Sequence, residues 1–187
     1  VYHKDKLDRI VNALSSINAA IYSTGGTKDY IEKLGVAVTS VEELTSFPSI
    51  LGGRVKTLHP KVFGGILARN DNKDDQVQIA KYEIPQFDLV IVDLYPFEET
   101  ALSGSTHNEI IEKIDIGGIS LIRAAAKNYQ YTTVVPSMND YDTILEILTQ
   151  KKGITTLEDR KKLAVKAFSI SSKYDTLICN YLKDGKD

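Results

Sequence analysis

Hydrophobic positions recur along this chain with two periods, and the periods alternate from one segment to the next. Between residues 7 and 17 the apolar positions lie three and four apart, which is typical of a helix with one buried face. Residues 19–23 form a short apolar run, typical of a buried strand. The pattern predicts a second helix that ends at Leu34, with Gly35 as its stop, and then a strand at 36–38.

The same alternation continues toward the C-terminal end. Residues 87–95 are the clearest strand, because their continuous Leu/Val/Ile run is typical of a parallel strand covered on both faces. A further strand is predicted at 131–135. The predicted helices of this part of the chain cover residues 76–82, 108–114, 119–127, 141–148 and 156–182. Strands that alternate with helices predict an α/β fold, with a mostly parallel sheet between helices in three layers.

Shorter segments complete the prediction. Val1 and Tyr2 have the character of the end of a strand, and Ser40 with Glu43 is typical of a capped short helix. The polar run 70–75 is predicted to be a surface loop, and residues 182–187 a linker. We find no repeat and no internal boundary, so residues 1–187 are predicted to form a single domain.

Composition narrows the class of protein. The 187 residues are 42% hydrophobic and 26% charged with a net charge of −2, which suits a soluble globular domain and excludes the global positive field of nucleic-acid binders. Cys179 is the single cysteine, so no internal disulfide can form. No apolar run is long enough for a membrane, and the N-terminal residues lack a signal-peptide pattern. We therefore expect a cytoplasmic protein without nucleic-acid or membrane partners.

The stretch Gly52–Pro60 is the strongest candidate for chemistry. If it is extended, Arg54 and Lys56 lie on one side, with the hydroxyl of Thr57 nearby. Two cations and a hydroxyl on a glycine-flanked loop suit a phosphate. Taken alone, the stretch is more typical of a solvated surface loop with two ordinary cations.

Two more glycine loops and one strand end could meet this stretch at the carboxyl edge of the sheet. Thr24–Thr27 joins a strand to a helix, Asp115–Gly118 opens a helix, and Asp93 and Tyr95 end the strand 87–95. Plainer roles stay open for these residues. Glycine pairs often only turn the chain, Asp93 and Asp115 could cap helices, and Tyr95 could pack at an edge.

The chain carries no zinc-type His/Cys cluster, no Gly-Lys-Ser/Thr phosphate loop and no nucleophilic elbow. A site that offers lysine, tyrosine and carboxylate, with no metal or cofactor, suits proton transfer on a phosphorylated small molecule.

Six motifs occur in an order that resembles a known family. They are Ser23–Thr27, Gly53–Pro60, Gly64–Arg69, Asp93–Phe97, Asp115–Gly118 and Arg123–Asn128. Together they resemble the IMP cyclohydrolase domain of the bifunctional purine-biosynthesis enzymes that also carry an AICAR transformylase. The resemblance implies a methylglyoxal-synthase-like fold and ring closure of formyl-AICAR (FAICAR) to IMP and water. It implies no metal or cofactor.

The resemblance also implies site residues. Those implied to hold the ribose phosphate are Lys4, Thr24, Gly25, Gly26, Thr27, Arg54 and Thr57. Others implied to bind the substrate are Asp93, Leu94, Ile116, Gly117 and Gly118. Those implied to surround the reacting base are Lys56, Tyr95, Asp115 and Lys127. We hypothesise that Asp115 and Lys127 carry out the proton transfers of the nucleophile, the carboxamide nitrogen. Lys56, Tyr95 and the amides of Gly117 and Gly118 would then stabilise the oxyanion.

The sequence departs from the family pattern at several positions. Tyr2 and His3 stand where the motif is often Ser-Asp, Asp93 replaces a common asparagine and Thr24 a serine. The resemblance implies a homodimer, with a transformylase domain C-terminal to this region in a full-length protein, and no transformylase activity is expected from residues 1–187. Two alternatives are a methylglyoxal synthase and a non-catalytic nucleotide-sensing domain like that of carbamoyl-phosphate synthetases.

Overall fold

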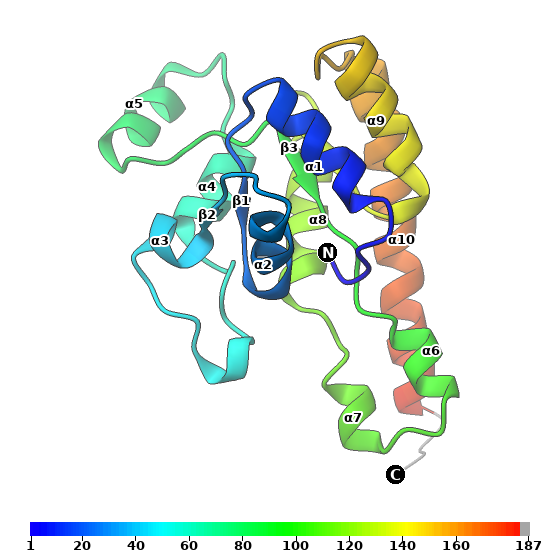
Figure 1. Ribbon diagram of the computed structural model, residues 1–187. Helices are drawn as coiled ribbons and strands as arrows, with labels where there is room; N and C mark the ends of the chain where they lie inside the picture. The colour runs from blue at the N-terminus through cyan, green and yellow to red at the C-terminus, as the bar shows by residue number, and fades with distance from the viewer. Residues whose placement is uncertain (184–187) are drawn as a thin grey trace.

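The computed structural model describes residues 1–183 and has helices packed around short parallel strands (Figure 1). The helices are α1 Leu7–Ser16, α2 Gly25–Lys33, α3 Val41–Thr45, α4 Pro60–Leu67, α5 Lys73–Lys81, α6 Phe97–Leu102, α7 His107–Ile111, α8 Gly117–Lys127, α9 Tyr141–Gln150 and α10 Leu157–Lys183. The strands are β1 Tyr22–Ser23, β2 Thr39–Ser40, β3 Leu89–Ile91 and β4 Thr133–Val135, and two 3-10 turns are η1 Leu51–Gly53 and η2 Met138–Asp140.

The predicted α/β class and the parallel strand direction are confirmed, but the sheet is divided into two pairs. β1 pairs with β2, with Tyr22 opposite Thr39, and β3 pairs with β4, with Val90 opposite Val134. Within the described residues, no ladder joins β1 to β3. The single sheet that the sequence predicts is therefore two short ribbons.

The strands β3 and β4 lie between two helical layers. On one face, Val135 packs with α1 and α9 through residues such as Ile10 and Ile144. On the other face, Val90 and Val134 pack with α4, α8 and α10. Figure 1 shows α10 running down one side of the molecule, partly behind α9. The predicted three layers are thus present around this pair.

The helix α8 lies at the centre of the packing. Its residues Ala124, Ala125 and Ala126 are buried against α4 and α10, where larger side chains would not fit. Asn128, just after the helix, donates from Nδ2 to the carbonyls of Ile66 and Ala68 at 2.7 and 2.9 Å. The helix that positions the loop 115–118 is therefore fixed at both of its flanks.

Several boundaries differ from the predictions. The helix α5 begins inside the predicted loop 70–75, because Asn72 caps it by accepting from the amide of Asp75. The strand expected at 36–38 is displaced to β2, and neither α4 nor α6 was predicted. The clearest predicted strand, 87–95, is shortened to the three residues of β3, since only these pair with β4 along their length.

The two ends of the chain also differ from expectation. The amide of Tyr2 donates to the Asp93 carbonyl at 3.1 Å, although Val1 and Tyr2 are not in a strand. The helix α10 continues to Lys183, so the predicted linker 182–187 is helical where it begins and otherwise lies outside the described residues. No helix within residues 1–183 has the length and apolar character to cross a membrane.

Candidate functional site

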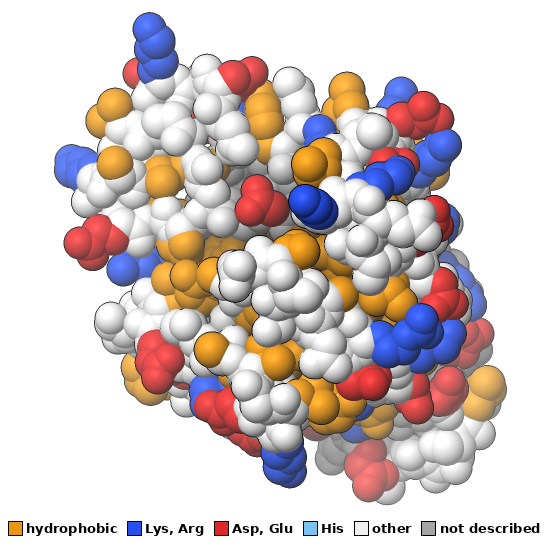
Figure 2. All heavy atoms as spheres, turned by 45° about the horizontal axis from the view of Figure 1, so that its top comes forward, with side chains coloured by type: hydrophobic (Ala, Val, Ile, Leu, Met, Phe, Trp, Pro, Cys, Tyr) orange, Lys and Arg blue, Asp and Glu red, His pale blue; other side chains and the backbone are white. Residues whose placement is uncertain are grey.

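A cavity of about 1490 Å³ opens between β1 and β3 and extends to the helix starts beside their carboxyl ends. Fourteen of the sixteen residues that the sequence suggests for the site line it: Lys4, Thr24, Gly25, Gly26, Thr27, Arg54, Lys56, Thr57, Asp93, Tyr95, Asp115, Ile116, Gly117 and Gly118. Its other end is apolar, near Leu14, Phe87 and Leu148. Figure 2 shows hydrophobic side chains gathered across the middle of the face turned toward the viewer.

The start of α2 forms one wall of the site. Gly25 takes the left-handed conformation, with a φ of +47°, and Thr24 before it is extended, so the chain turns sharply into the helix. The ammonium of Lys4 donates to the hydroxyl of Thr27 at 3.0 Å. Burial lowers the pKa of Lys4. The free amides of a helix start and a nearby ammonium make this wall electropositive.

The loop after η1 brings Lys56 to this wall. A Cβ on Gly25 would lie 3.8 Å from the ammonium nitrogen of Lys56, and a Cβ on Gly53 would lie only 2.5 Å from Lys56 Cε. Gly53 also has a φ of +89°. The Lys56 side chain therefore lies along a backbone position that only glycine can occupy without displacing it.

The same loop contacts the start of α8. The hydroxyl of Thr57 is 3.0 Å from the position of a Cβ on Gly117. Because this loop also reaches Gly25, two helix starts, α2 and α8, lie on either side of it. The three glycine loops that the sequence suggested are thus brought together.

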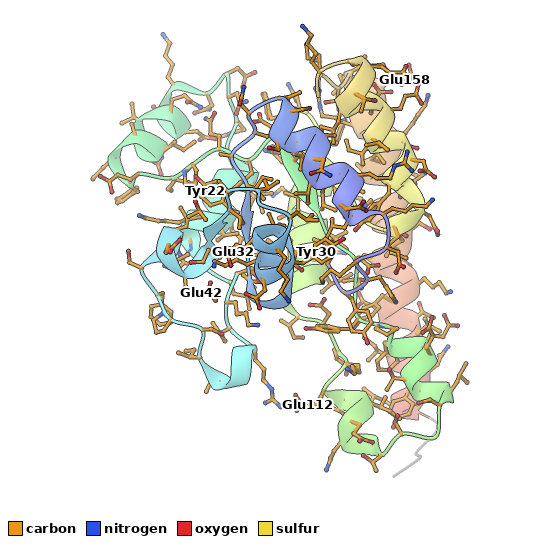
Figure 3. All side chains as sticks on the ribbon, in the orientation of Figure 1. Tyr22, Tyr30, Glu32, Glu42, Glu112 and Glu158 are labelled. Atoms are coloured by element: carbon orange, nitrogen blue, oxygen red, sulfur yellow. The ribbon has the colours of Figure 1, made fainter. Side chains whose placement is uncertain are left out.

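Arg54 is held by an acidic partner rather than directed freely at the cavity. Its guanidinium pairs with the carboxylate of Glu112, and both side chains are more than half exposed. Figure 3 shows Glu112 between α7 and the loop of η1. A phosphate bound by Arg54 would have to compete with this pair, which the sequence did not reveal.

Asp115 is a partly buried acid of the site. Its Oδ1 accepts from the amide of Gly118 at 2.6 Å, and a Cβ on Gly118 would lie 2.4 Å from Oδ2. Burial raises the pKa of Asp115, while the Gly118 amide and the terminal ammonium of Val1 oppose the rise. The carboxylate is therefore fixed in orientation and a stronger base than a solvated aspartate.

Asp93 and Tyr95 form the opposite wall with residues that the sequence did not single out as site residues. Asp93 Oδ2 accepts from the backbone amide of His3 at 2.7 Å and lies 2.8 Å from His3 Nδ1. The ring of Tyr95 packs edge-on against Tyr2, and the ammonium of Lys113 lies 5.6 Å from the Tyr95 ring centre. The sequence did offer one signal for these contacts, because Tyr2 and His3 depart from the Ser-Asp of the family motif. Both side chains contact this wall directly.

Leu94 and Lys127 are not brought into the cavity. Leu94 packs in the apolar clusters around Val92 and Phe97. Lys127 is exposed in the last turn of α8, whereas Gly117 at the first turn lines the cavity. An eleven-residue helix is about 16 Å long, so this Lys127 does not meet Asp115 of the same chain.

The cavity combines three cations with a pair of partly buried acids. Lys4, Arg54 and Lys56, together with two helix starts, suit an anion such as a phosphate. Asp93 and Asp115 line the same cavity and can accept protons or hydrogen bonds. Within residues 1–183, no group of three or more His, Cys, Asp or Glu side chains could hold a metal ion.

Comparison with known proteins gives a consistent set of relatives. The model of the MGS-like domain matches residues 6–120, and that of the AICARFT/IMPCHase bienzyme matches residues 125–187. The bifunctional purine biosynthesis protein PurH of Bacteroides thetaiotaomicron is 55% identical over 186 residues, which is 100% of this chain and 37% of that protein. PurH of Aquifex aeolicus is 48% identical over 183 residues, covering 98% of this chain and 36% of that protein.

A solved structure is also similar over nearly the whole chain. The crystal structure of ForH matches with a TM-score of 0.78 and 34% sequence identity, covering 97% of this chain and 94% of that one. The chain spans little more than a third of the length of the PurH proteins that it matches. The chain belongs to the MGS-like domain family, and its resemblance to the IMP cyclohydrolase part of the bifunctional purine-biosynthesis enzymes is confirmed.

Proposed function

We propose that this domain closes the purine ring of FAICAR to give IMP and water. One observation carries the proposal: Lys56 and Asp115 line the same cavity from two glycine loops, at a place where two helix starts can bind a phosphate. A ribonucleotide substrate has both features that such a site would recognise, a phosphate at one end and a neutral base at the other.

The phosphate is assigned to the start of α2. The amides of Gly25, Gly26 and Thr27 lie at the positive end of this helix, and Lys4 and Lys56 are adjacent to it. Arg54 would join them after releasing Glu112. This assignment places the base between Tyr95 and Asp115, which line the remainder of the polar part of the cavity.

The reaction needs one carbon–nitrogen bond to form and one carbon–oxygen bond to break. The carboxamide nitrogen attacks the formyl carbon, and the formyl oxygen becomes an oxyanion and then a hydroxyl. This oxygen leaves as water. Its two hydrogens correspond to one lost by the carboxamide nitrogen and one lost by the formamide nitrogen. A base near the carboxamide and proton donors near the formyl oxygen are therefore required.

Asp115 is suited to the base, because its buried carboxylate has a raised pKa and a fixed orientation. Lys56, Tyr95 and the amide of Gly117 are suited to the developing oxyanion, whereas the Gly118 amide already donates to the Asp115 carboxylate. A role of Lys127 in proton transfer stays a prediction from the resemblance. Within one chain the length of α8 separates Lys127 from Asp115.

The roles are tested by steady-state kinetics of two variants with FAICAR. We expect Asp115→Asn and Lys56→Met each to lower kcat by at least about 100-fold, the usual effect of removing a positioned base or an oxyanion donor. Lys113→Met is the matched control, because the Lys113 ammonium lies near the Tyr95 ring but Lys113 does not line the cavity. Near-wild-type kcat in the Asp115 variant would contradict the proposal.

A further inference from the structure

One tyrosine hydroxyl of the long helix α10 forms hydrogen bonds with the backbone of the loop that carries Asp115. The hydroxyl of Tyr174 accepts from the backbone amide of Asp115 at 2.7 Å and donates to the carbonyl of Lys113 at 3.0 Å. The two residues lie between the end of α7 and the start of α8, in a segment without regular structure. The hydroxyl oxygen of Tyr174 on α10 thus bridges the two ends of the loop 113–115.

Tyr174 is itself held in one position. Its side chain is buried, and its ring packs edge-on against Phe97 at 6.1 Å between ring centres. Burial raises the pKa of Tyr174 to about 12, so the hydroxyl keeps the proton that it donates to Lys113. A hydroxyl can accept from one backbone group and donate to the other at once, and phenylalanine at this position could do neither.

On the other side of the same residue, the Asp115 carboxylate is fixed by the Gly118 amide. The backbone and the side chain of Asp115 are thus held by separate partners, one from α10 and one from α8. Without the hydroxyl, the Gly118 contact alone would orient the carboxylate, on a loop whose partly buried Asp115 amide and Lys113 carbonyl had lost this partner.

We propose that Tyr174 is a positioning residue, which holds the loop 113–115 so that the carboxylate of Asp115 stays buried and directed at the substrate. This inference rests on the proposed function of Asp115 as the base. Tyr174 does not line the cavity and is not expected to touch the substrate. Its effect reaches the reaction through the backbone of Asp115.

Tyr181 provides a matched control on the same helix. Its hydroxyl lies 3.0 Å from His107 Nδ1 at the start of α7, and its ring also packs edge-on against Phe97, at 5.8 Å. Tyr181→Phe removes a comparable hydroxyl contact between α10 and α7. It leaves the contacts of Asp115 untouched, so it separates loosening of this region from displacement of the carboxylate.

The first test compares kcat, KM and the pH profile of Tyr174→Phe and Tyr181→Phe with FAICAR. For Tyr174→Phe we expect kcat to fall at least about tenfold, with KM within about twofold of wild type because the phosphate contacts remain. The acidic limb of its kcat profile should move to lower pH. Equal effects of the two variants on kcat and on the acidic limb would overturn the proposal.

The second test needs no turnover. Carbon-13 NMR of the side-chain carboxyl gives the pKa of Asp115 in the wild type and in both variants. We expect a lower pKa in Tyr174→Phe alone, because the released loop exposes the carboxyl to water. An unchanged Asp115 pKa in Tyr174→Phe would overturn the positioning role. If the pKa of Asp115 shifts in Tyr174→Phe but the wild-type protein does not convert FAICAR, the proposed function is contradicted. The positioning of Asp115 by Tyr174 is then still supported.

Discussion

Gly52 and Gly53 are neighbours with the same backbone preference and different surroundings. Both have positive φ values, +64° and +89°, which side chains other than glycine rarely adopt. A Cβ on Gly53 would lie within 2.9 Å of two Lys56 atoms, whereas a Cβ on Gly52 would meet nothing within 4 Å. The pair therefore separates backbone strain from contact with the proposed catalytic lysine.

We expect Gly53→Ala to reduce kcat/KM for FAICAR by more than about tenfold, because the added methyl group displaces Lys56. Gly52→Ala should cost about 1 kcal/mol of folding free energy from the same kind of strain but leave kcat/KM within about threefold. Kinetics and urea unfolding of both variants measure the two effects. Equal losses of kcat/KM would show that Lys56 placement is not the cause.

The raised pKa of Asp115 predicts a pH-dependent cost to stability. The unfolded carboxyl ionises near 3.8 and the folded one at higher pH, so stability is lost as pH rises through this interval. Asp115→Asn removes that loss and can still accept from Gly118. We expect the variant to gain unfolding free energy relative to wild type between about pH 3 and about pH 7, while losing turnover. A constant difference across this range would contradict the burial of the carboxylate.

At the scale of elements, the motif Arg123–Asn128 has structural roles that its resemblance did not reveal. The alanines 124–126 let α8 approach α4 and α10 closely, and Asn128 joins the end of α8 to the carbonyls that follow α4. Lys127 between them is exposed. Much of the motif is thus explained by packing around the site.

We expect Asn128→Ala to lower the free energy of unfolding by about 2 kcal/mol, because the buried carbonyl of Ala68 loses its partner. The carbonyl of Ile66 keeps a bond from the Thr132 hydroxyl at 3.1 Å. Chemical denaturation measures the loss. kcat of the folded variant should stay within about threefold of wild type, and a larger drop would show that Asn128 also acts on the site.

Over the whole molecule, the two strand pairs present unpaired edges to each other. The backbone bonds from the Val92 amide to the Val135 carbonyl and from the Thr133 amide to the Asp88 carbonyl set the register. They show that the backbone N–H and C=O groups of the even-numbered residues of β3 point toward β4. The backbone N–H and C=O groups of Leu89 and Ile91 therefore point away from β4, toward the cavity. In β1 the bond from Thr39 to Ile21 leaves Tyr22 facing the same side.

Amide hydrogen exchange should report this alternation. We expect the amides of Tyr22, Leu89 and Ile91 to exchange at least about tenfold faster than those of Val90 and Val92, which face β4. Residue-resolved NMR exchange measures both groups in one sample. Equal protection of neighbouring β3 residues would show that the edge is paired in solution.

Regular patterns were predictable from sequence, and contacts between distant segments were not. The apolar periods located α1, α8, α9 and α10, since each has a strong buried stripe. The division of the sheet depends on pairing between segments, which no local pattern records. Glycine loops predicted the walls of the site, whereas the Glu112 and His3 contacts required the fold.

The central claim is tested most directly by incubating the purified chain with FAICAR and following IMP formation by absorbance, with and without a metal chelator. The account predicts catalytic turnover at the same rate in both samples, because it assigns the proton transfers to side chains such as Asp115, Lys56 and Tyr95. Tight binding of IMP without any turnover would contradict it and favour a nucleotide-sensing domain.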